Sequence, residues 1–468
     1  MKNLQIHDKR LPVPSFFQVL NFGGGAGDKS REIVYADITG NTPALFNYYY
    51  VSNDIDHLFQ SPYFDDISSF ATFGDVLNHI REDLIGSKNN IYSKYPINPY
   101  DFNSKVLLLD SGAANIVKYT AEKVNYDTKA FFPCLLSQMY KYYDYADRTR
   151  FDIVIGFDLG GKYSFRDGET HNEKLISFYE SLDKDAVNKM LLEETVKYIK
   201  SKKDFFPCVM ATIHGKTPIE YANYTKFTLE LERKHGYEFW GFALGGIASY
   251  KSVDASWSDD FNFKRKGFGK LRNAFVAAKA IKIVHSLVGD RPIHALGCGG
   301  YPNITLNYFF GATSFDAATP ARRVGDGNDL STEYVFHPNT PSVVNGQTVS
   351  FSKMFVGGYN ADRTLRAGRM DYVKLCDIAD DCPLCGCAAC KKVPDIHAVK
   401  SLYAAKRSDE EAFYFSKQIM NAHAVLQHRL LCEIIADFSS FPQFKDASPS
   451  ILNTSLEHLY RHLQQFKS

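Results

Sequence analysis

Phe151-Asp152-Ile153-Val154-Ile155-Gly156-Phe157 is a short apolar run that ends at Asp158 and is followed by Leu159-Gly160-Gly161. A run of this length without polar alternation is typical of a strand buried on both faces, as in a parallel sheet. Similar runs, each ending in polar or glycine residues, recur at 44–50, 106–109, 206–213, 239–244, 293–296 and 311–315. The recurrence predicts a mainly parallel sheet.

Segments with a helical pattern separate these runs, for instance at 73–84, 173–200 and 271–288. Repeated strand–helix units are typical of a (β/α)8 barrel or of a doubly wound sheet. No G-x-G-x-x-G motif follows the first strand, which weakens the case for a dinucleotide-binding sheet. Seven candidate strands favour the barrel, and we place the eighth near Tyr372-Val373-Lys374-Leu375. The predicted fold is therefore an α/β protein with a (β/α)8, or TIM, barrel.

Composition narrows the class of protein. The 468 residues suffice for one large barrel with appendages, and 45% apolar against 23% charged residues allows a sizeable core. A formal charge of +1 excludes a globally basic nucleic-acid binder, so any such contact must come from a local patch. Nine cysteines, five of them in or near one stretch, suit a reducing compartment. With no signal peptide and no apolar run near the ~18 residues of a membrane span, we expect a soluble cytoplasmic protein without membrane contact.

Polar side chains stand where several predicted strands end: Asp110, Asp158, His214 and Asp316. The carboxyl ends of barrel strands form the active site in enzymes of this fold. A lone aspartate after a strand is often only the N-cap of the next helix. Three aspartates on separate strands, each beside small residues that leave room for a ligand, instead predict one shared site.

Cys385-Gly386-Cys387-Ala388-Ala389-Cys390 places three thiols within six residues. A C-x-C pair disfavours an intramolecular disulfide, and thiolates with one further ligand are typical of a closed, structural Zn²⁺ site. The sequence therefore predicts one structural zinc ion, whose remaining ligand is His423, Cys382 or His397.

Three regions follow from these patterns. Residues 1–375 hold N-terminal strands and the catalytic barrel, with an Asn-, Gly- and Thr-rich insertion at 324–375. Residues 376–430 form an inserted zinc-binding subdomain, and residues 431–468 form C-terminal helices that pack on the barrel.

The order of the motifs resembles that of the tRNA-guanine transglycosylases over about residues 30 to 435. The matching motifs are Asp-Ser-Gly (110–112), Phe-Asp (157–158), Phe-Ala-Leu-Gly-Gly-Ile (242–247), Leu-Gly-Cys-Gly (296–299), Ser-Phe-Asp-Ala-Ala-Thr-Pro-Ala-Arg (314–322), and C-x-C-x2-C followed by a histidine. These are barrel enzymes with an inserted zinc subdomain that exchange a guanine in nucleic acid for a 7-deazaguanine base.

The resemblance implies roles for individual residues. Asp316 would be the nucleophile and Asp110 the general acid and base. The implied base-binding groups are Ser111, Asp158, His214, Gly245, Gly246 and Ile247, with Gly246 and Ile247 acting through their backbone. The implied zinc ligands are Cys385, Cys387, Cys390 and His423.

Two departures from the family pattern bear on the substrate. Ala113-Ala114-Asn115 stands where the family usually has glycine, a base-stacking aromatic residue and glutamine, and His214-Gly215 replaces Gln-Gly. Such departures favour the DpdA-type branch, which inserts a 7-deazaguanine (preQ0-type) base into DNA. A tRNA-modifying enzyme is the alternative. A non-catalytic nucleic-acid-binding partner subunit is a further one, and the retention of both Asp110 and Asp316 argues against it.

A basic segment precedes the predicted helix at 271–288. Lys264, Arg265, Lys266 and Lys270 stand among Phe261, Phe263 and Phe268, which predicts contacts to phosphates and to unstacked bases, with a solvated helix start as the alternative. Arg322 and Arg323 follow the implied nucleophile in the sequence, and we expect them to bind a phosphate next to the target nucleotide. The expected partners are DNA or tRNA and the 7-deazaguanine base, with a homodimer or helper proteins compatible with the sequence.

Overall fold

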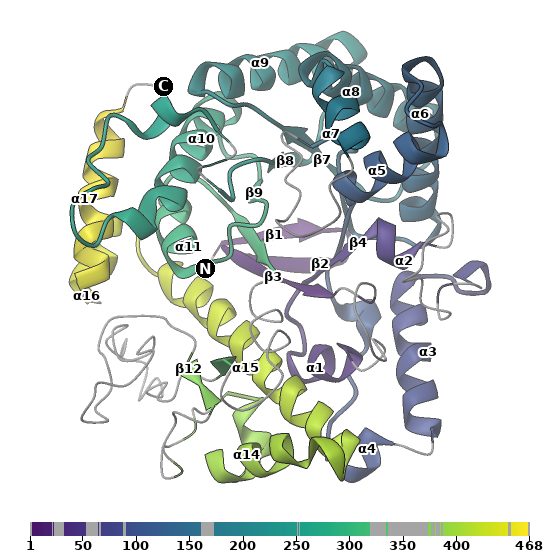
Figure 1. The fold of residues 1–468 in the computed structure, drawn as a ribbon, viewed down its shortest axis with the longest axis vertical. Coiled ribbons are helices and arrows are strands. Elements are labelled where there is room, and N and C mark those ends of the chain that lie inside the picture. The colour runs from purple at the N-terminus through teal and green to yellow at the C-terminus, as the bar shows by residue number, and fades with distance from the viewer. Residues whose placement is uncertain are drawn as a thin grey trace.

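A closed barrel of parallel strands forms the centre of the computed structural model (Figure 1). The structure describes residues 2–20, 22, 32–52, 64, 67–87, 90–160, 173–249, 251, 253–318, 334–335, 373–375, 380, 384, 387–447 and 451–466. In order around the barrel, its eight strands are β3 (Ser15–Leu20), β4 (Ala44–Asn47), β5 (Leu107–Asp110), β6 (Ile153–Ile155), β7 (Cys208–Ile213), β8 (Gly241–Leu244), β9 (Ile293–Ala295) and β10 (Ser314–Ala317). The predicted TIM barrel is confirmed.

The eighth strand lies at the opposite end of the chain from where the sequence places it. It is β3, which pairs with both β4 and β10 and closes the barrel. Val373–Lys374, within the predicted strand, instead forms β12, which pairs antiparallel with β11 (Tyr334–Val335) in a separate two-stranded sheet. The prediction of a barrel strand near 372–375 is therefore wrong. Most of the predicted insertion at 324–375 lies outside the described residues.

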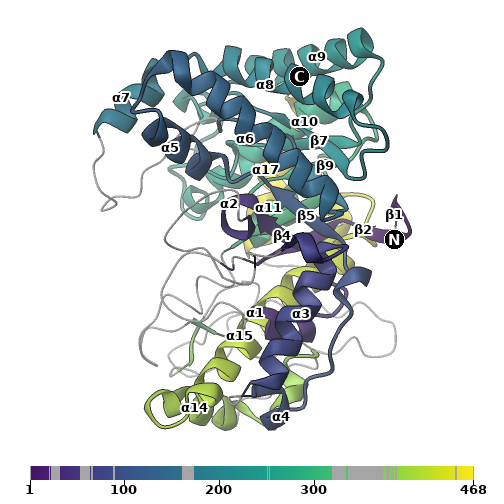
Figure 2. The same cartoon turned by 90° about the vertical axis from the view of Figure 1, so that its right-hand side faces the viewer.

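An N-terminal hairpin covers the amino end of the barrel. Its strands are β1 (Lys2–Ile6) and β2 (Lys9–Val13), which pair antiparallel and lie to one side of the barrel in Figure 2. The apolar cluster inside the barrel joins hairpin residues to strand residues: Ile6, Leu11, Phe17, Leu45, Val106, Leu108, Ile153, Ile155, Met210 and Ala243. Because the hairpin fills this end, the opposite end is left for a site.

Helices surround the barrel (Figure 1). They are α1 (Glu32–Ile38), α2 (Tyr48–Val51), α3 (Phe73–Gly86), α4 (Ile91–Lys94), α5 (Ala113–Lys123), α6 (Thr128–Arg148), α7 (Glu173–Ser181), α8 (Lys184–Ser201), α9 (Pro218–His235), α10 (Arg272–Val288), α11 (Tyr301–Tyr308), α14 (Ile396–Ala404), α15 (Glu410–Ile435), α16 (Phe441–Ala447) and α17 (Ile451–Gln465). The helices predicted at 73–84 and 271–288 are confirmed. The segment 173–200 forms two helices, because the Asp183 side chain accepts a hydrogen bond from the backbone of Ala186 and starts α8.

The C-terminal part of the chain is helical, as predicted. Helix α15 contacts α1, α11 and β3, so it covers the barrel wall on the side where β3 closes it. It is one continuous helix that runs through residue 430, where the sequence suggests a boundary. Of the helices in the described ranges, none has both the length and the apolar character needed to cross a lipid bilayer.

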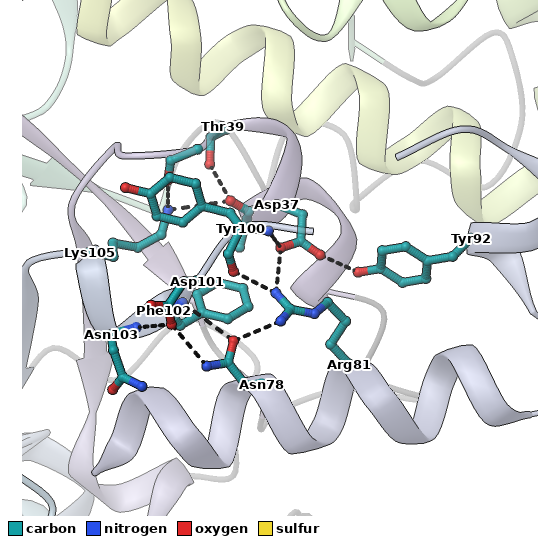
Figure 3. A network of polar contacts seen from close by, with 12 residues as sticks. Asp37, Thr39, Asn78, Arg81, Tyr92, Tyr100, Asp101, Phe102, Asn103 and Lys105 are labelled. Carbon is teal, nitrogen blue, oxygen red and sulfur yellow. Dashed lines mark hydrogen bonds and ion pairs between the residues drawn. The ribbon is translucent and has the colours of Figure 1, made fainter. Parts of the chain in front are cut away.

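A buried polar network ties α1 to α3 near the amino ends of β4 and β5 (Figure 3). Asp37 Oδ1 lies 3.1 Å from Arg81 Nη1 and accepts the backbone N–H of Tyr100 at 2.9 Å, while the Tyr92 hydroxyl donates to Asp37 Oδ2 at 2.5 Å. Lys105 Nζ donates to the carbonyl oxygens of Ala36, Gly40 and Thr42. The charges of this network all have close polar partners, which accounts for their burial.

Candidate active site at the carboxyl end of the barrel

Three aspartates from three strands meet at the carboxyl end of the barrel. Asp110 is the last residue of β5, Asp316 is the third residue of β10, and Asp158 follows β6. The pKa of Asp110 is raised to about 7, chiefly by burial and then by the negative charges of Asp158 and Asp316. Because such repulsion requires short separations, the structure brings the three predicted carboxyls into one site.

Asp316 is held by groups in β9 and just after it. The backbone N–H of Gly297 donates to Asp316 Oδ1 at 2.7 Å, and His294 Nε2 lies 3.2 Å from the same oxygen. Gly297 has a φ of +68°, a left-handed conformation that favours glycine. The side chain of Asp316 is 12% exposed. One carboxylate oxygen is therefore engaged by the protein.

Asp110 depends on the Asp-Ser-Gly motif that follows β5. The backbone N–H of Gly112 donates to Asp110 Oδ2 at 3.2 Å. Gly112 has a φ of +69°, and a Cβ on it would lie 2.1 Å from Asn47 Oδ1, so the turn requires glycine. Ser111 is fully buried, and its hydroxyl has no hydrogen-bond partner among the described residues. Buried hydroxyls in folded proteins are normally hydrogen-bonded, so an unpaired one beside a carboxyl marks this position as unusual.

Asp158 and His214 form a pair at the ends of β6 and β7. His214 Nε2 contacts Asp158 Oδ2, and both residues are buried. A Cβ on Gly245 would lie 2.4 Å from His214 Cε1, so the missing side chain lets β8 end against the imidazole. Gly246 follows with a φ of +76°. Ile247, the next residue, is fully buried.

A cavity of about 530 Å³ adjoins this pair. His214, Gly215 and Gly246 form part of its wall, and α8 contributes charged side chains that include Lys184 and Lys189. Asp110 and Asp316 do not line it. The cavity therefore lies beside the proposed recognition groups rather than between the two implied catalytic carboxyls.

Cys387, Cys390 and His423 form a cluster that could hold a metal ion, with their ligand atoms within 4.8 Å of one another. His423 Nδ1 lies 3.5 Å from Cys387 Sγ and 3.2 Å from Cys390 Sγ. In a tetrahedral site with bonds of about 2.3 Å to sulfur and about 2.0 Å to nitrogen, the two atoms would be about 3.5 Å apart. The spacing of the donors therefore fits a metal ion.

The cluster also decides between two of the alternatives for the remaining ligand. His423 is fully buried on α15 and belongs to the cluster. The side chain of His397 is 71% exposed and lies 3.7 Å from Asp380, outside the cluster. Cys382 and Cys385 lie outside the described residues.

The predicted basic segment lies on the surface between β8 and α10. Lys264, Arg265, Lys266 and Lys270 are exposed, so they are available to phosphates. The aromatic rings of the segment instead pack with one another and with Phe275 of α10, at centroid distances of 4.9 to 5.6 Å. Phe268 is 3% exposed and so cannot stack on a base. Arg322 and Arg323 lie outside the described residues.

No protein-family model matches the chain, and no curated protein has a matching sequence. The fold and the acidic site at the strand ends define a (β/α)8 barrel of the kind that commonly serves as an enzyme. Sequence reasoning missed His294, which it treated as part of an apolar strand. A polar residue inside an otherwise apolar strand could have drawn attention to it. Its closeness to Asp316, however, depends on the register between β9 and β10, which the sequence does not show.

Proposed function

We propose that this protein is a base-exchange transglycosylase that replaces guanine in DNA with a 7-deazaguanine base through a covalent aspartyl-sugar intermediate. The observation that carries the proposal is that three carboxyl groups with different surroundings lie in one site. Asp316 has one oxygen engaged, Asp110 has a pKa of about 7, and Asp158 faces an imidazole. A nucleophile, an acid–base group and a recognition group are what base exchange requires.

In the first half-reaction, Asp316 attacks the sugar. The carboxylate oxygen that has no partner among the described residues forms a bond to C1′ while the C1′–N9 bond to guanine breaks, as in retaining glycosidases. The electron pair of the broken bond goes to N9, which Asp110 protonates. A carboxyl with a pKa near 7 is still substantially protonated at neutral pH, so Asp110 is suited to donate this proton.

The second half-reaction reverses these bond changes with a different base. Asp110, now ionised, accepts the N9 proton of the incoming 7-deazaguanine. N9 then attacks C1′, the ester bond to Asp316 breaks, and its electron pair returns to the carboxylate. Dividing the exchange into two steps leaves the phosphodiester chain intact.

Recognition of the base falls to Asp158 and its neighbours. An ionised Asp158 can accept hydrogen bonds from the ring N–H and the exocyclic amine of a guanine-like base, a charge-assisted pair that selects such bases. His214 and the backbone around Gly246 stand beside it. The target nucleotide must leave its stack to reach this position.

The metal assigned to the cluster is zinc, because two thiolates and an imidazole are typical zinc ligands. Cys385 is the predicted additional ligand. The ion would fix residues 387–390 against α15 and has no role in the bond changes.

DNA is the favoured polymer on the departures at Ala113-Ala114-Asn115 and His214. The exposed cations Lys264, Arg265, Lys266 and Lys270 can contact phosphates of either polymer.

Nucleoside analysis of DNA and tRNA from cells that express the protein tests the proposal. We expect a 7-deazaguanine nucleoside in DNA, and none in cells that express Asp316→Asn. A modified base in tRNA alone would support the proposed reaction but show that tRNA, not DNA, is the substrate. No modified base in either polymer, with folded protein and a supply of the free base, would overturn the proposed function.

A further inference from the structure

His294 lies inside the barrel, next to the implied nucleophile. It is fully buried at the middle of β9, and the strand register pairs it with Ser314 of β10. Asp316 stands two residues beyond Ser314 on β10, so both side chains point to the same face of the strand. His294 therefore lies one layer deeper in the barrel than the carboxylate of Asp316.

Contacts fix the imidazole of His294 from several sides. Its Nδ1 lies 2.9 Å from Ser314 Oγ, and its Nε2 lies 3.2 Å from Asp316 Oδ1. Phe17 of β3 meets the ring edge to face, with centroids 5.6 Å apart and planes at 89°. Because the ring is packed, it cannot turn away from Asp316 without displacing its neighbours.

We infer that His294 is a positioning residue that sets which oxygen of Asp316 attacks the sugar. In the arrangement we assign, the Ser314 hydroxyl donates to Nδ1, so the hydrogen of the imidazole is on Nε2, which lies 3.2 Å from Asp316 Oδ1. Nε2 makes no hydrogen bond within the described part of the chain, so its contact with Oδ1 is a close approach beside the N–H of Gly297, which donates to the same oxygen. Both groups lie against Oδ1, and among the described residues Oδ2 has no partner and can reach C1′. This role rests on the proposed function.

The same arrangement serves both half-reactions. In the first, Oδ2 uses a lone pair to form the bond to C1′, and Oδ1 becomes the carbonyl oxygen of the ester. In the second, the C1′–Oδ2 bond breaks and its electron pair returns to a carboxylate whose Oδ1 accepts from Gly297 and lies against His294. Loss of the Nε2–H should therefore slow formation and breakdown of the intermediate without weakening the binding of nucleic acid.

A serine, a histidine and an aspartate in contact also suggest a hydrolase triad, and the geometry opposes it. Ser314 is 4% exposed and lies two residues deeper in the barrel than Asp316. In a triad the serine must face the substrate. Here Asp316 is nearest to the open end of the site. The contacts from Ser314 to His294 and from His294 to Asp316 therefore act on the aspartate and not on the serine.

A matched pair of variants tests the role. His294→Gln keeps an N–H donor at a similar reach, whereas His294→Met has a similar length and no donor. His428→Met is the control, because His428 is also buried, stacks on Phe16 at a centroid distance of 4.8 Å, and contacts through Nδ1 the carbonyl of Ala424 in its own helix. Each purified, zinc-loaded protein is assayed in single turnover for guanine release from DNA and from tRNA, with its thermal midpoint and its Kd for nucleic acid.

We expect His294→Met to slow intermediate formation about 100-fold at unchanged Kd, with His294→Gln within about tenfold of the unsubstituted protein. The control should not change the rate. Nitrogen NMR of histidine-labelled protein should give His294 as the neutral Nε2–H tautomer. An equal rate for His294→Met, or the Nδ1–H tautomer, in an active protein would overturn the role and leave the proposed function standing. Absence of guanine release from both polymers by the unsubstituted protein would overturn both.

Discussion

Near the amino end of the barrel, the carboxylate of Asp37 faces Arg81 and accepts hydrogen bonds from the Tyr92 hydroxyl and from the backbone of Tyr100. At the carboxyl end, the partners of Asp110 among the described residues are backbone N–H groups, and it faces two further carboxyls. Both aspartates are desolvated, and burial is the main cause that raises the pKa of each. The difference is that Arg81 and Tyr92 act against the shift at Asp37, whereas Asp158 and Asp316 add to it at Asp110.

The contrast suggests different roles for the two ends of the barrel, stability at the amino end and activity at the carboxyl end. A buried charge whose polar partners are all present stabilises the barrel wall, because removing one partner would leave an uncompensated buried charge. A group of like charges with few partners is costly to the fold and is the arrangement that active sites use to tune acidity. We therefore expect substitutions at the amino end to change stability and those at the carboxyl end to change activity.

The largest effect should come from Asp316→Asn. An amide has no negative charge and is a poor nucleophile, so base exchange should fall by about 10³-fold or more. The thermal midpoint and zinc content should stay near those of the unsubstituted protein. If Asp316→Asn lost its folding as well as its activity, the expectation that substitutions at the carboxyl end change activity would be contradicted. The measurement is incorporation of labelled 7-deazaguanine alongside a melting curve.

Arg81→Met is the counterpart at the amino end. It leaves the Asp37 carboxylate buried without its cation and should cost about 3–5 kcal/mol of unfolding free energy. Arg461→Met is the control, because Arg461 is 69% exposed in an ion pair on α17 and its loss should cost less than about 1 kcal/mol. Denaturant unfolding measures both. Equal losses in the two variants would contradict the structural role assigned to the network.

The metal cluster sharpens the comparison, because it also gathers ionisable side chains in one place, and we expect a bound ion there to stabilise the fold. Cys390→Ser should lower the zinc content from about one per chain and reduce thermal stability. Cys432→Ser is the control, since Cys432 is buried on α15 outside the cluster. Elemental analysis and melting curves decide, and full zinc content in Cys390→Ser would remove Cys390 from the ligand set.

Asp110 should give the smallest and most graded effect. Because its folded-state pKa is about 7, the rate of guanine release should fall up to tenfold per pH unit above about pH 7, where the proton donor is lost. The same raised pKa means that its contribution to stability is present at low pH and is lost as pH rises through the folded value. Asp110→Asn should therefore melt higher than the unsubstituted protein at pH 8. A pH-independent release rate would contradict this assignment.

Most barrel strands could be predicted because they are uninterrupted apolar runs. The exception, β3, carries a polar residue whose partners are distant in sequence. Gln18 donates to the carbonyl of Thr42 at 3.2 Å and accepts from the Thr39 hydroxyl at 2.8 Å. Such a satisfied buried amide looks like a surface residue in the sequence. The run at 372–375 pairs instead with a two-residue strand that no local pattern marks.

The site was predictable to the extent that strand ends converge in any barrel. That rule places Asp110, Asp158, His214 and Asp316 together without side-chain detail. It does not reveal the contact between His214 and Asp158, or that between His294 and Asp316, because each depends on how far one strand is shifted against another.

The central claim is that Asp316 forms a bond to the sugar, and intact-protein mass spectrometry after incubation with guanine-containing DNA tests it most directly. Without an incoming base, we expect a covalent protein–DNA adduct, mapped by proteolysis to the peptide that contains Asp316 and absent in Asp316→Asn. An adduct on Asp110 or Asp158, or released guanine without any adduct, would contradict the account.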